Sequence, residues 1–177
     1  MRQGWNQQVD FPACGGRGGM VISIEPIYKL LEQYKLLNNA HIILLCPRGE
    51  KFTQTRSREL EKISSKSTIV FLCGHYEGID ERIQHFISER ISIGDYIISS
   101  GTLASAVVLE GIVRLIPNVI SEESLESESF NNSETPDDFD FPCYAPPKNF
   151  LNLKIPENLV NLSKRKSTSQ ISKKKKK

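Results

Sequence analysis

The ten residues 73–82, CGHYEGIDER, are the most chemically varied stretch of this sequence. They follow the apolar run 67–72, STIVFL, and combine two glycines, a histidine, a tyrosine and four charged side chains. Packing seldom requires so many special residues in so short a segment. Glycine allows a main chain to approach a ligand closely, and polar side chains beside it can orient that ligand. The stretch is therefore typical of a ligand-binding loop at the end of a buried strand.

Two further loops of this kind accompany the other short apolar runs. CPRG lies at 46–49, and SIGDYIISSG lies at 92–101. Ligands of open α/β sheets collect at the carboxyl ends of the strands, so we expect the three loops to lie around one site. Each loop taken alone is equally explained as an ordinary turn. The sequence contains neither GxGxxG nor GxxxxGK[ST], which argues against a dinucleotide or nucleoside triphosphate site.

The elements that position these loops are predicted from the spacing of apolar residues. A parallel sheet is favoured, because apolar runs alternate with helical patterns. The glycine-rich GGRGG at 15–19 is either a fragment of an RNA-binding RGG sequence or a tight turn, and the turn is favoured. In chain order, we predict a helix from residue 25, a strand at 41–46, a loop at 47–51, a helix at 57–63, a strand at 68–73, a short helix at 81–87, a strand at 92–99 and a mostly buried helix at 102–116.

Length and composition favour one domain. The chain has 177 residues, of which 38% are hydrophobic, enough for one core with a tail beyond it. No apolar run approaches the roughly 20 residues of a membrane helix, and the start carries no export signal, so a soluble cytoplasmic protein is expected. The four cysteines have no CxxC spacing, and neither a zinc or other metal site nor a disulfide framework is expected.

The charges are distributed unevenly along the chain. Residues 161–177 hold 8 of the 23 Lys and Arg and no acid, while residues 118–141 hold 8 acids and no base. Neither segment has an apolar pattern that could build a core. We therefore expect an α/β domain at 1–117, a mobile acidic linker at 118–141 and a disordered, low-complexity basic tail at 163–177.

Six motifs between residues 9 and 160 occur together, in the same order, in one known family. They are VDFPACGGRGGMV, LCPRGEKFTQ, CGHYEGIDER, SIGDYIISSG, VRLIPNV and FDFPCYAPPKNFLNLKIPENL. The sequence resembles the bacterial tRNA (guanine-1)-methyltransferase family of the knotted SPOUT class. The resemblance implies a SPOUT-type parallel sheet with a C-terminal trefoil knot, an exception to the rule that protein chains avoid knots. It also implies that residues 142–162 are the remnant of a C-terminal tRNA-binding region.

The same resemblance implies a cofactor and an assembly. S-adenosyl-L-methionine would bind in the knot in a bent conformation, with its adenine enclosed by the three loops. The family forms homodimers in which each guanine site is shared between subunits, and tRNA is the substrate. By motif, the cofactor-binding positions fall on Leu45, Pro47, Gly74, Tyr76, Glu77, Gly78, Ser92, Ile93, Gly94, Tyr96, Ile98, Ser100, Gly101 and Ala104.

The reaction implied is methylation of N1 of the guanosine at position 37 of tRNA, on the 3′ side of the anticodon. N1 carries a proton and is a poor nucleophile until a base removes it, and charge that moves onto O6 requires a cation opposite. Arg114, in VRLIPN, matches the family's arginine and would face O6. The family's base is an aspartate before a Ser-Phe pair; the matching stretch here is ESF, which makes Glu128 the candidate base.

The sequence departs from the family pattern in several places. It begins after the family's first strand and helix, which predicts either a truncated chain or an incomplete sheet. Arg17 stands in the glycine-rich motif where a small residue is usual, and YAPP at 144–147 replaces YTRP, whose arginine can contact phosphate. The C-terminal helical domain is replaced by the lysine run. Two hypotheses follow: a methyltransferase with reduced activity, and a degenerate, non-catalytic paralogue that binds S-adenosyl-L-methionine and RNA.

Overall fold

The computed structural model describes residues 8–15, 18–126, 128–130, 139, 142–157 and 159. It divides into two compact units, Met1–Asp138 and Phe139–Lys177, and each is described by itself. Arg17 and the basic tail predicted at 163–177 lie outside the described residues, as do parts of the predicted linker. Among the described residues, no helix combines the length and the apolar character needed to cross a membrane.

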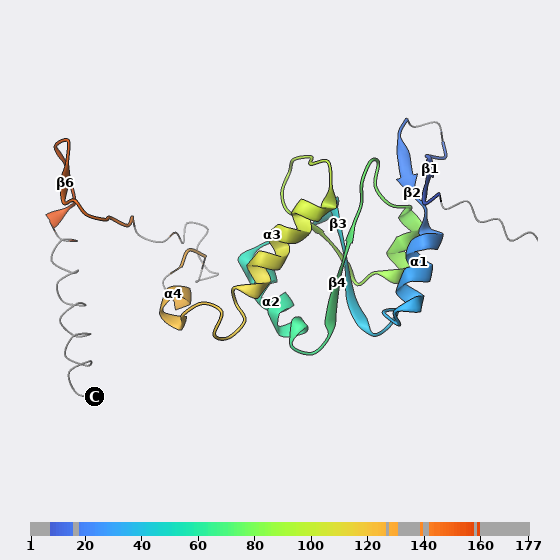
Figure 1. Ribbon diagram of the computed structural model, residues 1–177, viewed down its shortest axis with the longest axis horizontal. Coiled ribbons are helices and arrows are strands. Elements are labelled where there is room, and N and C mark those ends of the chain that lie inside the picture. Colours follow the sequence, from blue (N-terminus) through green and yellow to red (C-terminus); the bar gives the residue numbers. More distant parts are fainter. Residues whose placement is uncertain are drawn as a thin grey trace, which may run out of the picture. The chain divides into compact units, whose positions relative to one another are not determined.

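A three-stranded parallel sheet forms the centre of the first unit (Figure 1). Its strands are β3 (Ala40–Lys51), β4 (Thr68–Cys73) and β5 (Glu89–Ser92), in the order β4-β3-β5. In β3 the buried run of residues 42–45 consists of Ile and Leu only, which is typical of a parallel strand covered on both faces. The predicted parallel sheet and the strands at 41–46 and 68–73 are therefore confirmed.

The third strand lies elsewhere than predicted. The strand expected at 92–99 is a loop after Ser92, and the real strand, β5, ends at that residue. Ile93 still packs against the core, but the apolar residues farther along the loop do not: Tyr96 is 57% exposed and Ile97 is 80% exposed. The prediction was wrong because alternating apolar residues signal a strand whether or not a sheet edge lies beside them.

The loop predicted at 47–51 is instead the second half of β3. Leu45 and Glu50 both pair with Ile91 of β5, so the register shifts between them and the intervening residues bulge out. Gly49 permits this, since a Cβ atom there would lie 2.5 Å from the backbone nitrogen of Ile91. The bulge carries Pro47 past the end of β4, toward the loops that follow the strands.

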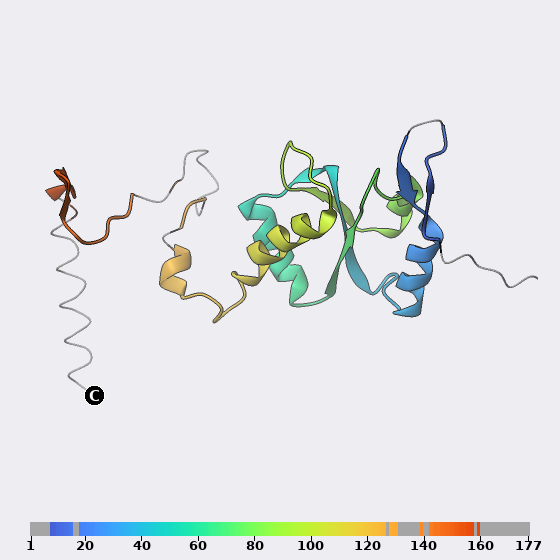
Figure 2. The same cartoon turned by 45° about the horizontal axis from the view of Figure 1, so that its top comes forward.

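Helices cover both faces of the sheet (Figures 1 and 2). One face carries α2 (Gln54–Ser64) and α3 (Gly101–Val113), and the other carries α1 (Ile24–Gln33) with the 3-10 helix η1 (Glu81–Phe86). Serine, threonine and aspartate caps begin three of them by accepting a hydrogen bond from a backbone amide two or three residues on. The capping residues are Thr53, Asp80 and Ser100.

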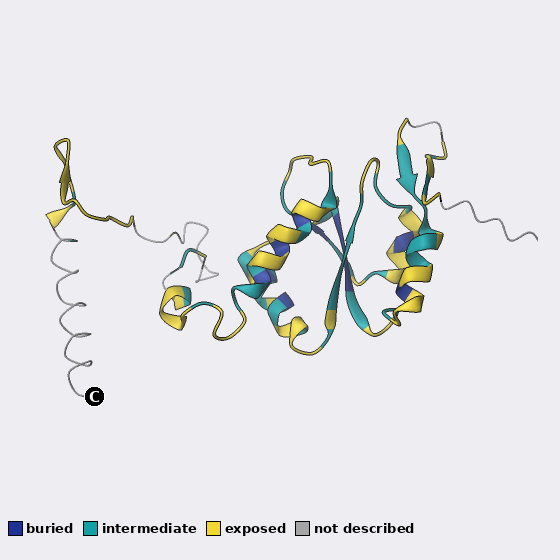
Figure 3. Cartoon of the chain, viewed as in Figure 1, coloured by how far each residue is buried: buried dark blue, intermediate teal, exposed yellow. Residues whose placement is uncertain are grey.

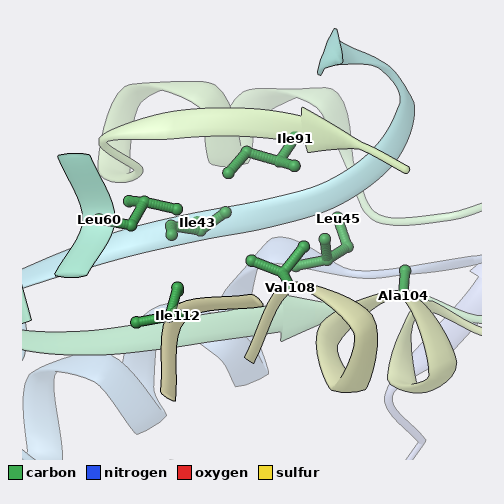
Figure 4. Packing of buried hydrophobic residues seen from close by; sticks show 7 residues of the cluster. All are labelled: Ile43, Leu45, Leu60, Ile91, Ala104, Val108 and Ile112. Carbon is green, nitrogen blue, oxygen red and sulfur yellow. The ribbon is translucent and has the colours of Figure 1, made fainter. Parts of the chain in front are cut away.

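The main core lies between the sheet and the α2 and α3 pair (Figure 4). Ile43 and Leu45 point to this face because side chains alternate along a strand, and Leu60 and Val108 meet them from the two helices. Ile91 of β5 completes the layer. All of these are nearly inaccessible to solvent, so the carboxyl ends of the strands rest on a rigid base.

Only one stripe of α3 is buried, which corrects the predicted mostly buried helix. Ala104, Val108 and Ile112 face the core, while Leu103 and Val107 are 64% and 51% exposed (Figure 3). The helix is apolar all round, a composition that predicts burial on every side. A single copy of the chain leaves its outer face uncovered.

A close crossing fixes α2 against α3. The hydroxyl of Ser57, in α2, donates a hydrogen bond to the carbonyl of Gly111, in α3, at a donor–acceptor distance of 2.5 Å. A Cβ atom at Gly111 would lie 2.9 Å from the ring of Phe52 and 3.2 Å from Oγ of Ser57, so a larger residue there would require these side chains to shift. The crossing sets the position of the residues that follow α3.

The remaining elements are short. A hairpin of β1 (Asp10–Pro12) and β2 (Met20–Ile22) precedes α1. The stretch predicted as a linker contains the one-turn helix α4 (Glu122–Glu126). In the second unit, Asn149–Phe150 and Leu153–Lys154 pair as the hairpin β6 and β7.

Candidate functional site

A cavity of about 650 Å³ lies at the carboxyl ends of the three parallel strands. The bulge of β3, the 74–80 loop after β4 and the 92–101 segment after β5 form its walls, as expected for an open α/β sheet. Every residue predicted at a cofactor-binding position lines it, from Leu45 and Pro47 through Gly101 and Ala104. That these residues bind a cofactor stays a prediction, but the structure does bring them together.

The 74–80 loop is shaped by residues that tolerate unusual backbone angles. Gly78 has φ +105°, and its amide donates to the carbonyl of His75 over 2.9 Å, closing a tight turn. Tyr76, inside this turn, also has a positive φ, of 56°, and its ring remains mostly exposed. A non-glycine residue in this conformation costs free energy and is enriched at ligand sites.

Two of the walls are joined by main-chain contact. The amide of Gly101, the first residue of α3, donates a hydrogen bond to the carbonyl of Gly74 at a donor–acceptor distance of 3.0 Å. A Cβ atom at Gly101 would lie 2.9 Å from Cα of Cys73, so no larger residue fits without movement of the backbone. The cavity is therefore bounded by main-chain groups at close range, which is how a flat base is recognised by amides and carbonyls.

The N-terminal hairpin supports the 74–80 loop from outside. The amide of Ile22, in β2, donates to the carbonyl of Gly78 (3.0 Å), and the amide of Asp80 donates back to Ile22 (2.9 Å). The amide of Glu77 donates to Met20 over 3.1 Å. These bonds explain why the glycine-rich motif and CGHYEGIDER occur together, because the strand that follows the first motif holds the loop formed by the second.

The third wall is ordered by a serine and a glycine. The hydroxyl of Ser92 donates to the carbonyl of Gly94 and accepts from its amide, at 3.1 and 3.3 Å. Gly94 has φ +151°, and a Cβ atom there would collide with the ring of Tyr96. Because Gly94 has no side chain, the ring of Tyr96 can occupy this position in the wall of the cavity.

Ion pairs border the cavity on the side of η1. One carboxylate oxygen of Glu81 accepts a hydrogen bond from Arg90, and the other accepts one from Arg48. Each donor–acceptor distance is 2.5 Å. The hydrogen bond from Arg90, with a smaller contribution from Arg48, lowers the pKa of Glu81 below its ordinary value. Glu81 is therefore ionised at neutral pH, and its charge is shared between two cations.

The predicted catalytic pair is in direct contact. Nη2 of Arg114, one residue after α3, lies 2.5 Å from Oε2 of Glu128, and only 28% and 15% of these side chains are exposed. The hydrogen bond to Glu128 raises the pKa of Arg114 above its ordinary value. Nε2 of Gln54 donates to the other oxygen, Oε1, over 3.2 Å. A carboxylate and a guanidinium are thus presented side by side, one able to accept a proton and the other to stabilise negative charge.

The pair and the cavity lie at opposite ends of α3. Ala104 lines the cavity near the start of the helix, and Arg114 follows its last residue. Ten residues of helix separate them by about 15 Å along the axis. Within one copy of the chain, the predicted cofactor residues therefore lie together and the predicted catalytic pair is in contact. The two groups of residues are, however, far from one another.

Several residues at the site were not predicted. Gln54 was missed although it ends the motif LCPRGEKFTQ, because its role depends on a contact 74 positions away. The additional cavity residues lie beside or near predicted ones and could have been found by extending each loop by one to three positions. They are Leu44, Cys46, Arg48, His75, Ile79, Glu81, Ile91, Ile97 and Ser99.

The described residues contain no group of three or more His, Cys, Asp or Glu side chains that could hold a metal ion. None of the four cysteines, all of which lie among the described residues, forms a disulfide: Cys46 follows the buried run of β3, Cys73 ends β4, and Cys14 and Cys143 are exposed.

Comparison with known proteins supplies independent information. The family model for tRNA (Guanine-1)-methyltransferase TrmD matches residues 2–177. A protein of Carboxydothermus hydrogenoformans named tRNA (guanine-N(1)-)-methyltransferase is 43% identical over 158 residues, which is 88% of this chain and 59% of that protein. Proteins with the same name from Malacoplasma penetrans and Mycoplasma mobile are 40% and 42% identical, over 66% and 76% of their own lengths. The chain thus spans about three fifths to three quarters of these relatives.

Proposed function

This chain belongs to the tRNA (guanine-1)-methyltransferase family, and we propose that it transfers a methyl group from S-adenosyl-L-methionine to N1 of guanosine 37 of tRNA. One observation carries the proposal. The residues at the family's cofactor positions, drawn from three separate loops, line a single cavity at the carboxyl ends of the sheet.

The cavity fits the cofactor in size and in chemistry. Its volume suits a nucleoside with a short side chain, and glycines at Gly74 and Gly101 allow main-chain amides and carbonyls to reach an adenine. When bound, the cofactor supplies a methyl group activated by the positive sulfur. The fold that encloses it is proposed to be the SPOUT trefoil knot.

The catalytic roles follow from the Arg114 and Glu128 pair. Glu128 accepts the proton of guanine N1 and so makes that nitrogen nucleophilic. Arg114 donates to O6, where negative charge collects as the proton leaves. The two side chains form a direct ion pair, so guanine takes its place between them by exchanging this contact for one from Arg114 to O6 and one from Glu128 to N1.

Two copies of the chain are required to complete this site. The separation of about 15 Å along α3 exceeds the length of any side chain, so the pair of one copy cannot act at its own cavity. The exposed apolar face of α3, with Leu103 and Val107, offers a surface on which a second copy can pack. We therefore propose a homodimer in which the pair from one copy meets the cavity of its partner, with tRNA bound across both.

A second function is favoured by one feature of the C-terminal unit. Pro146, in an exposed stretch, stands where the family carries an arginine able to contact phosphate. Loss of that contact weakens the hold on tRNA, and we expect a reduced rate of methyl transfer. In the limit, the chain would bind the cofactor and RNA without efficient transfer.

Titration calorimetry with S-adenosyl-L-methionine, followed by incubation with unmodified tRNA and detection of 1-methylguanosine by mass spectrometry, tests both functions. We expect binding and formation of 1-methylguanosine at position 37. Binding without product supports the non-catalytic alternative, and the absence of binding contradicts both. tRNA with adenosine at position 37 is the matched substrate control.

A further inference from the structure

The base candidate is held by one side chain from each of two helices. One carboxylate oxygen of Glu128 accepts from Arg114, after α3, and the other accepts from Gln54, the first residue of α2. Both oxygens are therefore engaged, by a cation on one side and by a neutral amide on the other. The proposed reaction gives Arg114 a role, but it does not explain the hydrogen bond from Gln54.

The close helix crossing explains why Gln54 and Arg114 converge. Ser57 and Gly111 are the contact point of α2 and α3. Gln54 precedes Ser57 by three residues and Arg114 follows Gly111 by three, so each side chain lies one helical turn from the crossing. Because a hydrogen bond from the fully buried Ser57 joins the two helices at this crossing, both side chains have a rigid support.

A second residue of α2 holds the same segment. Arg58, four residues after Gln54 and so on the same helix face, donates to the carbonyl of Phe130 at 3.4 and 3.5 Å. Phe130 lies two residues after Glu128 and has a positive φ of 61°, a strained conformation that needs support from its surroundings. The α2 face thus bonds the backbone at one end of this turn and the carboxylate at the other.

We propose that Gln54 is a positioning residue for the base, with Arg58 holding the turn that carries it. The proposal rests on the proposed function. In the reaction, Arg114 transfers its hydrogen bond to O6 of guanine and so releases Oε2 of Glu128. The amide of Gln54 then keeps the carboxylate aimed at N1, and because the amide is neutral it does not compete for the proton. A carboxylate in this place would repel Glu128.

The test compares Gln54→Leu, which removes the donor at similar size, with Gln54→Glu and with the control Thr55→Ala, an exposed neighbour on α2. Single-turnover methyl transfer with saturating tRNA and cofactor measures the chemical step. We expect both Gln54 variants to transfer about 10-fold to 100-fold more slowly than the parent, as a misplaced reacting group does. The Kd for S-adenosyl-L-methionine should stay within about twofold, since Gln54 does not line the cavity.

Hydrogen exchange provides a readout that does not depend on activity. Amides of residues 122–130 should exchange faster in Gln54→Leu than in Thr55→Ala, because the turn has lost one of its bonds to α2. Unchanged exchange, a transfer rate equal to that of Thr55→Ala, or an equal loss of cofactor affinity would each overturn the proposal. A parent protein that binds but never transfers would contradict the proposed function instead, and the exchange measurement would still decide whether Gln54 holds the turn.

Discussion

Replacement of Gly101 by alanine should displace the start of α3 from the end of β4. The new Cβ atom would lie 2.9 Å from Cα of Cys73 and 3.1 Å from the nitrogen of Gly74, while ordinary contact begins at 3.4 Å. Both neighbours are main-chain atoms at the end of a packed sheet, so the helix must move by about 0.5 Å. Overpacking of this kind costs about 1–3 kcal/mol, and the better helix propensity of alanine offsets about 1 kcal/mol at most.

The consequence should be larger for binding than for stability. A shift of the helix also breaks the bond between the amide of Gly101 and the carbonyl of Gly74, which joins two walls of the cavity. We expect the Kd for S-adenosyl-L-methionine to rise at least about 10-fold, equivalent to about 1.4 kcal/mol, with a fall of a few degrees in Tm. Gly18→Ala is the matched control, since a Cβ atom there meets nothing within 4 Å. A folded Gly101→Ala protein with parental affinity would show that this cavity is not the cofactor site.

Three other substitutions have defined outcomes. Glu128→Gln should lower the single-turnover rate of methyl transfer by about 100-fold or more while cofactor affinity, measured by calorimetry, is unchanged; a rate near the parent's would remove Glu128 as the base. Leu103→Glu combined with Val107→Glu should convert a dimer into a monomer in analytical ultracentrifugation, because two charges would have to be buried at the contact; an unchanged mass would place the dimer contact elsewhere. The pKa of Glu81 is lowered chiefly by Arg90, so its contribution to stability is present above the ordinary glutamate pKa of about 4.3 and is lost as the pH falls through the lowered value. Glu81→Gln should therefore reduce the loss of Tm on acidification below that pH, and parallel melting curves would contradict this.

Local sequence predicted the elements whose burial is decided within the chain. The apolar runs of β3 and β4 and the helical spacing of α1 and α2 each satisfy one period over a whole element. The predictions of a strand at 92–99 and of a mostly buried α3 were wrong for a common reason. Ile97 and Leu103 are apolar, and a pattern of apolar residues cannot tell whether they cover the core of their own chain or remain exposed.

The site was predictable where it depends on short motifs and not where it depends on distant contacts. The residues predicted at cofactor positions lie in or beside three contiguous loops, so motif matching located them, whereas nine of their neighbours in the cavity lining were missed. The hydrogen bond of Gln54 to Glu128 joins positions 74 residues apart and requires the α2 and α3 crossing, where Ser57 donates a hydrogen bond to Gly111. Nothing in the local pattern around Gln54 carries that information.

Mixed dimers test most directly the claim that each site is built from two copies. Equal amounts of Glu128→Gln and Gly101→Ala chains should be allowed to exchange subunits and assayed at a cofactor concentration that saturates only an intact cavity. Half of the dimers are then mixed, and each holds one site with an intact cavity and an intact pair, so the mixture should recover about one quarter of the parental activity. Activity no greater than the mean of the two variants assayed separately would contradict the account, because it would place the cavity and the catalytic pair of each site in the same chain.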